Sequence, residues 1–207
     1  SESEINILNK ITKIDSVKFY NQKYRLNDVI YYRNAGGRYW RLVKSFKSFF
    51  RASSGENISS TEKILPINKE HKLAFVALYS SNLFYWYWRV VSNCRHLTDR
   101  ELFALPIPEF LIENNKNKAV ISTLAQEYEV SLKNNKEIIV VQNNRSGETA
   151  QDVYYLYLSK SIIDEIDKVL AQHYGFTEEE LDFIINYDIK YRMGLSKSGS
   201  GQEEEEE

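Results

Sequence analysis

The longest apolar run of the chain is Leu-Ala-Phe-Val-Ala-Leu-Tyr-Ser-Ser-Asn-Leu-Phe-Tyr-Trp-Tyr-Trp, at residues 73–88. Its 16 residues are too few to span a bilayer, and the Ser-Ser-Asn triplet at 80–82 interrupts it. We therefore expect a pair of buried helices within residues 69–93, broken near the triplet, and no membrane anchor. Residues 83–91 are then core helix and not a ligand-binding stretch.

Short stretches before this run have the composition of β-strands. They are rich in β-branched and aromatic residues, and turn-forming residues separate them. We expect strands at 17–20, 29–32, 38–43 and 62–67. The connection Asn-Ala-Gly-Gly at 34–37 tolerates positive φ and predicts a hairpin. A helix is expected ahead of these strands, at 5–14, where apolar residues recur at helical spacing.

Capping signals and helical spacing dominate the region after the apolar run. The segment Thr-Asp-Arg-Glu at 98–101 fits a capping box, and it leads into Leu-Pro-Ile-Pro at 105–108, where each proline favours an extended predecessor. We place a subdomain boundary just after it, near 109–117. Beyond that boundary the sequence predicts helices at 117–133, 160–174 and 178–187, with strands at 137–142 and 152–158 around a polar loop at 143–150.

The fold class predicted from these elements is α+β. A β-rich subdomain with packed helices is expected at 1–110, followed by a mainly helical subdomain at 111–195. The tail at 196–207 combines Ser and Gly with five Glu. Because this composition has no apolar surface to bury, we expect the tail to be disordered.

Charge is divided unevenly along the chain, although the net charge is only −2. Residues 1–110 hold 17 Lys and Arg against 10 Asp and Glu, whereas residues 111–207 hold 10 against 19. Within 18–51, nine basic residues accompany a single acid. This local excess is typical of a phosphate-binding surface, and a solvated basic face without a ligand is the alternative.

Sequence signatures of most catalytic sites are absent. The chain contains no Gly-rich phosphate loop, no Gly-x-Ser-x-Gly elbow and no Asn-Pro-Pro-Tyr motif. The three histidines share no metal-ligand spacing, and the single cysteine excludes an internal disulfide framework and fits a reducing cytoplasm. Asp188-Ile-Lys190 resembles the end of a nuclease metal site, but a match of this length arises by chance in most chains. We therefore expect no catalytic residue, metal site or cofactor site in this chain.

Base-reading chemistry is concentrated in the segment Tyr-Tyr-Arg-Asn-Ala-Gly-Gly-Arg-Tyr-Trp-Arg, at 31–41. Arg donates two hydrogen bonds to guanine and Asn pairs both ways with adenine, while aromatic neighbours stack on bases or support long side chains. For some of these aromatic residues, burial in a core is the alternative. The candidate base-reading residues are Arg33, Asn34, Arg38, Tyr39 and Arg41. The candidate phosphate-binding residues are Lys44, Lys47, Arg51, Lys63 and Arg95.

Three groups of motifs resemble a known type of domain. They are Tyr-Tyr-Arg-Asn with Gly-Arg-Tyr-Trp, at 31–34 and 37–40; the apolar stretch at 78–89 with Asn-Cys-Arg-His-Leu-Thr at 93–98 and Leu-Pro-Ile-Pro at 105–108; and Phe-Ile-Ile-Asn-Tyr-Asp-Ile-Lys-Tyr-Arg-Met at 183–193. Over roughly residues 15–193 they resemble the TaqI-like C-terminal specificity domain of adenine-specific DNA methyltransferases and type IIG restriction–modification enzymes. The order of apolar helix, short helix and Leu-Pro-x-Pro is also similar to the target recognition domains of type I specificity subunits.

The resemblance implies that this chain recognises double-stranded DNA and that the β-rich half reads bases in the major groove. It also implies a methyltransferase domain, N-terminal to this chain, that binds S-adenosylmethionine and flips the target adenine. The helical half would then support the recognition half against that domain or a partner. The alternative is a protein-interaction module whose acidic half docks a methylase within a defence complex, and a third reading is a free-standing nuclease that uses Asp188 and Lys190.

Overall fold

The computed structural model describes residues 1–14, 25–35, 42–53, 55–56, 58–143 and 147–189. Both helices and strands are present, which confirms the α+β class. The helices in these ranges are α1 (Glu2–Lys13), α3 (Lys72–Ser80), α4 (Asn82–Val91), α5 (Asp99–Ala104), α6 (Lys116–Asn134), α7 (Lys160–Tyr174) and α8 (Glu178–Asn186). The strands are β1 (Asp28–Arg33), β2 (Val43–Lys44), β3 (Phe50–Ala52), β4 (Gly55–Glu56), β5 (Glu62–Ile67), β6 (Lys136–Asn143) and β7 (Gly147–Tyr154).

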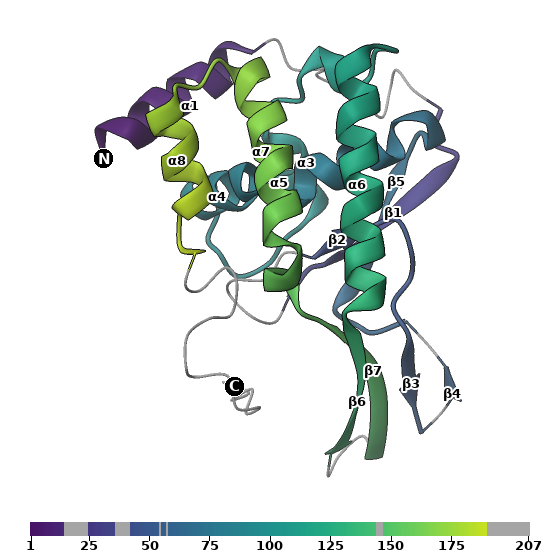
Figure 1. Ribbon diagram of the computed structural model, residues 1–207. Helices are drawn as coiled ribbons and strands as arrows, with labels where there is room; N and C mark the ends of the chain where they lie inside the picture. The colour runs from purple at the N-terminus through teal and green to yellow at the C-terminus, as the bar shows by residue number, and fades with distance from the viewer. Residues whose placement is uncertain (15–24, 36–41, 54, 57, 144–146, 190–207) are drawn as a thin grey trace.

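Helices α3 and α4 form the centre of the molecule, as the apolar run predicts. Every residue from Ala74 to Trp88 is buried, and a helix that is apolar on all sides is stable only when other elements cover it. Ser81 separates the two helices: its ψ of 157° ends α3, and its hydroxyl accepts the N–H of Phe84 at 3.0 Å to start α4. The covering helices are α6 and α7, which pack on α3, and α8, which packs on α4 (Figure 1).

Local capping determines several of the helix ends. Thr98 and Thr177 both form capping boxes, with Glu101 and Glu180 respectively, and these start α5 and α8. Gly175 ends α7 with a φ of 67°, in the left-handed region that favours glycine. In the part of the chain that the structure describes, no helix combines the length and the apolar character needed to cross a membrane.

The first sheet, sheet A, has the strand order β2-β1-β5, with all neighbours antiparallel. Along β1 the side chains alternate between the two faces, and Ile30 and Tyr32 on one face are buried against α3. Leu65 and Ile67 of β5 are buried on the same face. This alternation explains why the strands at 29–32 and 62–67 could be predicted.

The second sheet, sheet B, has the strand order β4-β3-β7-β6 and extends away from the helical body (Figure 1). Its longest part is the β6–β7 hairpin, whose register runs from Lys136↔Tyr154 to Asn143↔Gly147. The sequence-based prediction of these strands was partly wrong. Strand β7 begins at Gly147 instead of residue 152, because cross-strand pairing extends through a segment whose polar composition indicates a loop.

The two predicted subdomains, 1–110 and 111–195, are not separate units. Strand β3 of the first pairs with β7 of the second, and α3 packs on α6 and α7. One continuous cluster of buried apolar side chains draws on both parts. The predicted boundary near 109–117 therefore lies within a shared core, because an apolar helix pair such as α3 and α4 needs more cover than the first 110 residues supply. The predicted strand at 17–20 and the tail at 196–207 lie outside the described residues.

Candidate nucleic-acid interface

Asn34 follows β1 and joins it to two other parts of the chain. Its backbone N–H donates to the carbonyl of Thr61 at 2.9 Å, and its carbonyl accepts the N–H of Leu97 at 2.8 Å. Leu97 belongs to the loop between α4 and α5, which is far from β1 in the sequence. The Leu97 hydrogen bond therefore places the loop that carries Arg95 beside the end of β1, and the Thr61 hydrogen bond holds the start of β5 there.

The side chain of Asn34 has an acceptor without a partner. Its Oδ1 atom is buried and receives no hydrogen bond from the residues that the structure describes. A buried acceptor left in this state costs on the order of 1–3 kcal/mol, and such atoms often mark a functional position. Turning the amide toward a bound ligand would therefore break no hydrogen bond between Oδ1 and the described part of the chain.

Arg33 is the last residue of β1 and is half-buried. Its Nε donates to the carbonyl of Ala35 at 3.0 Å, so the guanidinium is turned back along its own chain. Across the sheet, Arg33 pairs in register with Glu62 of β5. To contact a base, the side chain would have to exchange the Ala35 hydrogen bond for one to the ligand.

The loop that follows α4 presents Arg95 to solvent. Cys94 adopts a φ of 61°, and the side chain of Asn93 accepts the N–H of Arg95 at 3.0 Å, which together determine the loop conformation. At the far end of the loop, the hydroxyl of Tyr32 donates to Asp99 at 2.9 Å and holds the start of α5 against β1. The exposed position of Arg95 is therefore set by contacts on both sides of it.

Lys63 lies at the same end of sheet A. It is exposed, and it pairs in register with Tyr32, one residue before Arg33. The structure thus places four of the predicted contact residues at one end of sheet A, with Lys63 and Arg33 on opposite faces of the sheet. We call these four residues the sheet A cluster: Arg33, Asn34, Lys63 and Arg95. Sequence distance hides this grouping, because three separate segments contribute to it.

Two further predicted phosphate contacts lie toward sheet B. Lys47 is exposed and precedes Ser48, whose hydroxyl donates to Glu62 at 2.6 Å. Arg51 on β3 is also exposed; its guanidinium lies 3.9 Å from Glu148, and both side chains are more than half exposed. A pair of this kind contributes little to stability and leaves Arg51 accessible to a ligand.

Lys44 was predicted to bind phosphate, but the structure buries it. Only 1% of its side chain is exposed, and its Nζ atom lies 2.5 Å from Glu62. The rings of Tyr31, Phe46 and Tyr154 surround the ammonium at 5.4 to 5.7 Å. Burial lowers the pKa of Lys44, and the nearby carboxylate of Glu62 opposes that shift. Since this cation is enclosed and already paired, it is not available to a DNA phosphate.

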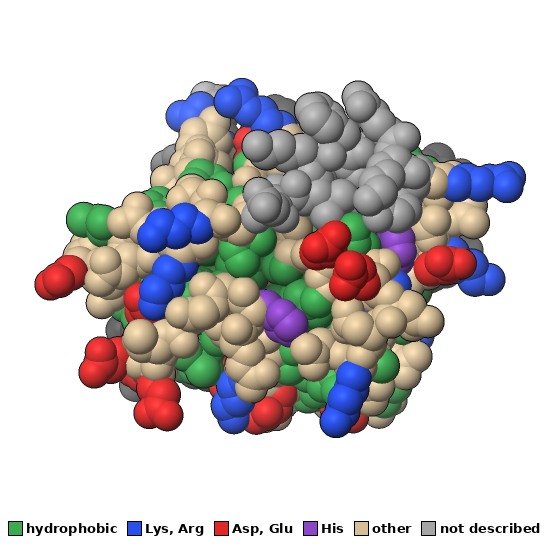
Figure 2. Space-filling model, turned by 90° about the horizontal axis from the view of Figure 1, so that it is seen from above, with side chains coloured by type: hydrophobic (Ala, Val, Ile, Leu, Met, Phe, Trp, Pro, Cys, Tyr) green, Lys and Arg blue, Asp and Glu red, His purple; other side chains and the backbone are tan. Residues whose placement is uncertain are grey.

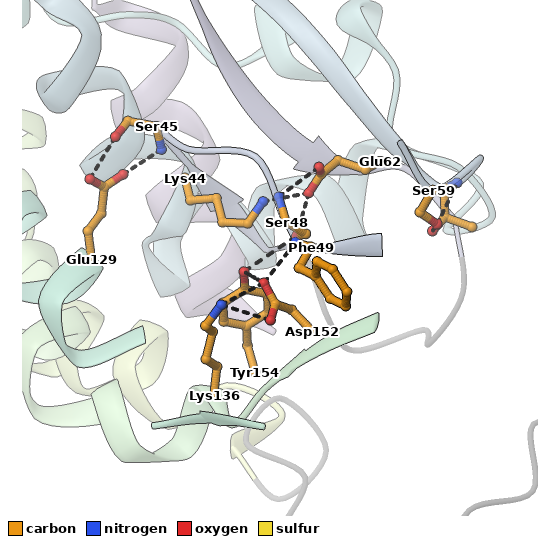
Figure 3. Close-up of polar contacts among 11 residues, drawn as sticks. Lys44, Ser45, Ser48, Phe49, Ser59, Glu62, Glu129, Lys136, Asp152 and Tyr154 are labelled. Carbon is orange, nitrogen blue, oxygen red and sulfur yellow. Dashed lines mark hydrogen bonds and ion pairs between the residues drawn. The ribbon is translucent and has the colours of Figure 1, made fainter. Parts of the chain in front are cut away.

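Lys44 belongs to a polar network between the two sheets that the sequence did not predict (Figure 3). Glu62 accepts a hydrogen bond from Lys44. Asp152 accepts the backbone N–H of Phe49 at 2.8 Å and forms an ion pair with Lys136 at 2.8 Å. On the other side, Glu129 of α6 accepts from the backbone and hydroxyl of Ser45. Ser45, Ser48 and Phe49 are all held by this network, so it fixes the segment that carries Lys47 between the two sheets.

The pKa of Asp152 indicates that this network favours charged carboxylates. Burial by itself would raise that pKa, but the ion pair with Lys136 and the hydrogen bonds from Phe49 and Tyr154 outweigh burial and lower it. The pKa of the Tyr154 hydroxyl is raised, first by burial and then by the neighbouring carboxylates. Both groups therefore remain in their ordinary ionisation states at neutral pH and act as structural partners.

Other predicted positions can be placed only in part. Arg38, Tyr39 and Arg41, which complete the predicted base-reading set, lie outside the described residues, as does Lys190. Asp188 lies 3.6 Å from Arg89 and accepts from the Tyr85 hydroxyl at 3.4 Å. Within the described ranges, no group of three His, Cys, Asp or Glu side chains is arranged to hold a metal ion.

Charge on the helical end of the molecule is mixed. On the face in Figure 2, Lys and Arg side chains are interspersed with Asp and Glu, so the described side chains form no single-sign patch there. The sheet A cluster and the two cations toward sheet B remain the clearest grouping of the predicted contacts. Comparisons with protein-family models, with curated proteins and with solved structures find no match to this chain.

Proposed function

We propose that this chain binds double-stranded DNA in a sequence-dependent manner and serves as the target recognition module of an adenine-specific DNA methyltransferase or restriction–modification enzyme. The observation that carries the proposal is the sheet A cluster. Two residues suited to base edges, Arg33 and Asn34, lie at the same end of sheet A as two exposed cations, Lys63 and Arg95. Specific DNA recognition needs this combination, because phosphate contacts position a protein and base contacts specify the sequence.

Two features of the sequence support the same function. The first is the excess of basic residues at 18–51, of which Arg51 on β3 and Lys47 just before β3 are exposed. The second is the resemblance of the motifs to TaqI-like specificity domains. By that resemblance, adenine methylation and S-adenosylmethionine binding belong to a methyltransferase domain outside this chain, and cytoplasmic DNA is the substrate.

The proposal is tested by measuring duplex DNA binding as a function of salt. Binding of a fluorescent duplex is followed by anisotropy at several salt concentrations, for the wild type and for Lys63→Ala and Arg95→Ala. Each variant is expected to weaken all sequences about equally and to reduce the slope of log affinity against log salt by about 1. Lys116→Ala, which removes an exposed charge at the start of α6, is the matched control and should leave the slope unchanged.

Two results would refute DNA recognition. One is the absence of duplex binding at low salt both by the chain alone and when it is joined to a methyltransferase domain. The other is binding that Lys63→Ala, Arg95→Ala and the control all weaken to the same extent. A stable methylase partner that co-purifies with the chain, together with DNA binding indifferent to Arg33 substitution, would instead favour the assembly module.

A further inference from the structure

Strand β6 is an edge strand whose central residues are apolar and exposed. The exposed fractions are 58% for Ile138, 38% for Ile139, 56% for Val140 and 44% for Val141. Successive side chains of a strand point to opposite faces, so both faces of β6 carry exposed apolar groups. In the described part of the chain, β7 is the only strand paired with β6, which leaves the backbone groups of its outer edge without a strand partner.

The charges next to this edge do not protect it. Natural edge strands usually avoid pairing with other chains through charged side chains, proline or bulges. Lys136 is ion-paired with Asp152 of its own sheet at 2.8 Å, and Glu137 accepts the Tyr155 hydroxyl at 2.7 Å. No charged residue or proline occurs from 138 to 143. The edge is therefore open to pairing over most of its length.

We propose that β6 pairs antiparallel with β6 of a second copy of this chain. A two-fold axis beside Ile139 would set that residue opposite itself and Ile138 opposite Val140. The same register sets Lys136 opposite Gln142 and Glu137 opposite Val141, so no like charges face each other. Pairs of β-branched residues directly across a sheet stabilise it, and the strand is thus self-complementary in both shape and charge. Sheet B then continues across the two copies.

This dimer does not depend on DNA, so it can be tested separately from the proposed function. Sedimentation or light scattering without DNA is expected to show a monomer–dimer equilibrium with a dissociation constant on the order of micromolar. Val140→Lys is expected to weaken dimerisation at least about tenfold, because a cation on each copy would lie close to the two-fold axis. Val130→Lys is the matched control: Val130 is a 55% exposed valine on α6, and its substitution should have no effect.

Cysteine crosslinking locates the contact. The chain has a single cysteine, so Cys94→Ser gives a background without thiols. Directly opposite residues of an antiparallel pair have Cα atoms about 4.5–5.5 Å apart, within the range that a disulfide spans. Ile139→Cys in this background should form a covalent dimer under mild oxidation, because residue 139 faces itself across the two-fold axis, while Val130→Cys should remain largely monomeric. A monomer at high protein concentration, or crosslinking at 139 no faster than at 130, would overturn the proposal.

Discussion

The carboxylate of Asp167 binds Asn82 through two hydrogen bonds, from the backbone N–H at 3.0 Å and from the side-chain amide at 2.9 Å. It also accepts the N–H of Leu83 at 3.0 Å. A residue of α7 thereby satisfies the first donors of α4, a helix whose first turn contains no acidic residue of its own. Burial raises the pKa of Asp167 to about 7, although the backbone donors oppose the shift.

This arrangement predicts a pH dependence of the free energy of unfolding. The pKa of Asp167 is about 7 in the folded protein against an ordinary value of 3.8, so between those pH values the folded state holds a proton that the unfolded state releases. The contribution of Asp167 to stability is therefore full below about pH 4 and declines as the pH rises to about 7, by about 1 kcal/mol per pH unit.

Asp167→Asn removes this titration. We expect the variant to lose more stability relative to the wild type at pH 5 than at pH 8, as measured by urea denaturation at each pH. Asp182→Asn, on the exposed side of α8, is the control and should lack this difference. Equal destabilisation by Asp167→Asn at the two pH values would contradict the assignment.

A second prediction concerns the buried pair of Lys44 and Glu62. Lys44→Met leaves the carboxylate of Glu62 nearly buried without its cation, and this is expected to lower the free energy of unfolding by about 3–5 kcal/mol. The double variant Lys44→Met with Glu62→Gln removes both charges and should recover part of the loss. Denaturant titration measures both. Lys47→Met, at an exposed lysine three residues away, should stay within about 0.5 kcal/mol of the wild type.

A third prediction distinguishes two glycines with similar backbone angles. Gly147 has a φ of +73°, and a Cβ added there would lie 2.5 Å from the Ser53 hydroxyl. Gly175 has a φ of +67°, with no atom within 4 Å of such a Cβ. Gly175→Ala should therefore cost about 1–2 kcal/mol, from backbone strain, and Gly147→Ala should cost more. Ser53→Ala in the Gly147→Ala background should restore part of the difference; equal thermal shifts for the two glycine variants would argue against the close contact.

A fourth prediction concerns sequence specificity. Once a preferred duplex has been selected from a random pool, Asn34→Ala and Arg33→Ala should each relax discrimination at one base pair by roughly 1–3 kcal/mol. Lys63→Ala should weaken preferred and unrelated duplexes alike, because the contact proposed for Lys63 is with phosphate, which carries no sequence information. Competition binding against single-base variants of the site measures the difference. Unchanged discrimination in both Arg33 and Asn34 variants would place base reading elsewhere in the chain.

The accessibility of the predicted phosphate-binding residues could not be read from the sequence. The excess of basic residues at 18–51 does not show which side chains reach solvent. Lys47 and Arg51 are exposed. Lys44, only three residues before Lys47, is instead enclosed by aromatic rings and paired with Glu62. A strand places neighbouring residues on opposite faces, so which basic residues are buried depends on what covers each face.

The sequence by itself determined the α+β class and the elements whose signals are local. Apolar periodicity and capping residues lie within a few positions of each other, and they predicted α7, the helix break at Ser81 and the capping box at Thr98. The tertiary structure decided which residue of α7 binds the start of α4, and which segments meet in the sheet A cluster. Asp167 meets Asn82 across 85 residues, and Asn34 meets the Arg95 loop through Leu97. Contacts between distant segments depend on how helices and sheets pack, and no local pattern in the sequence specifies that packing.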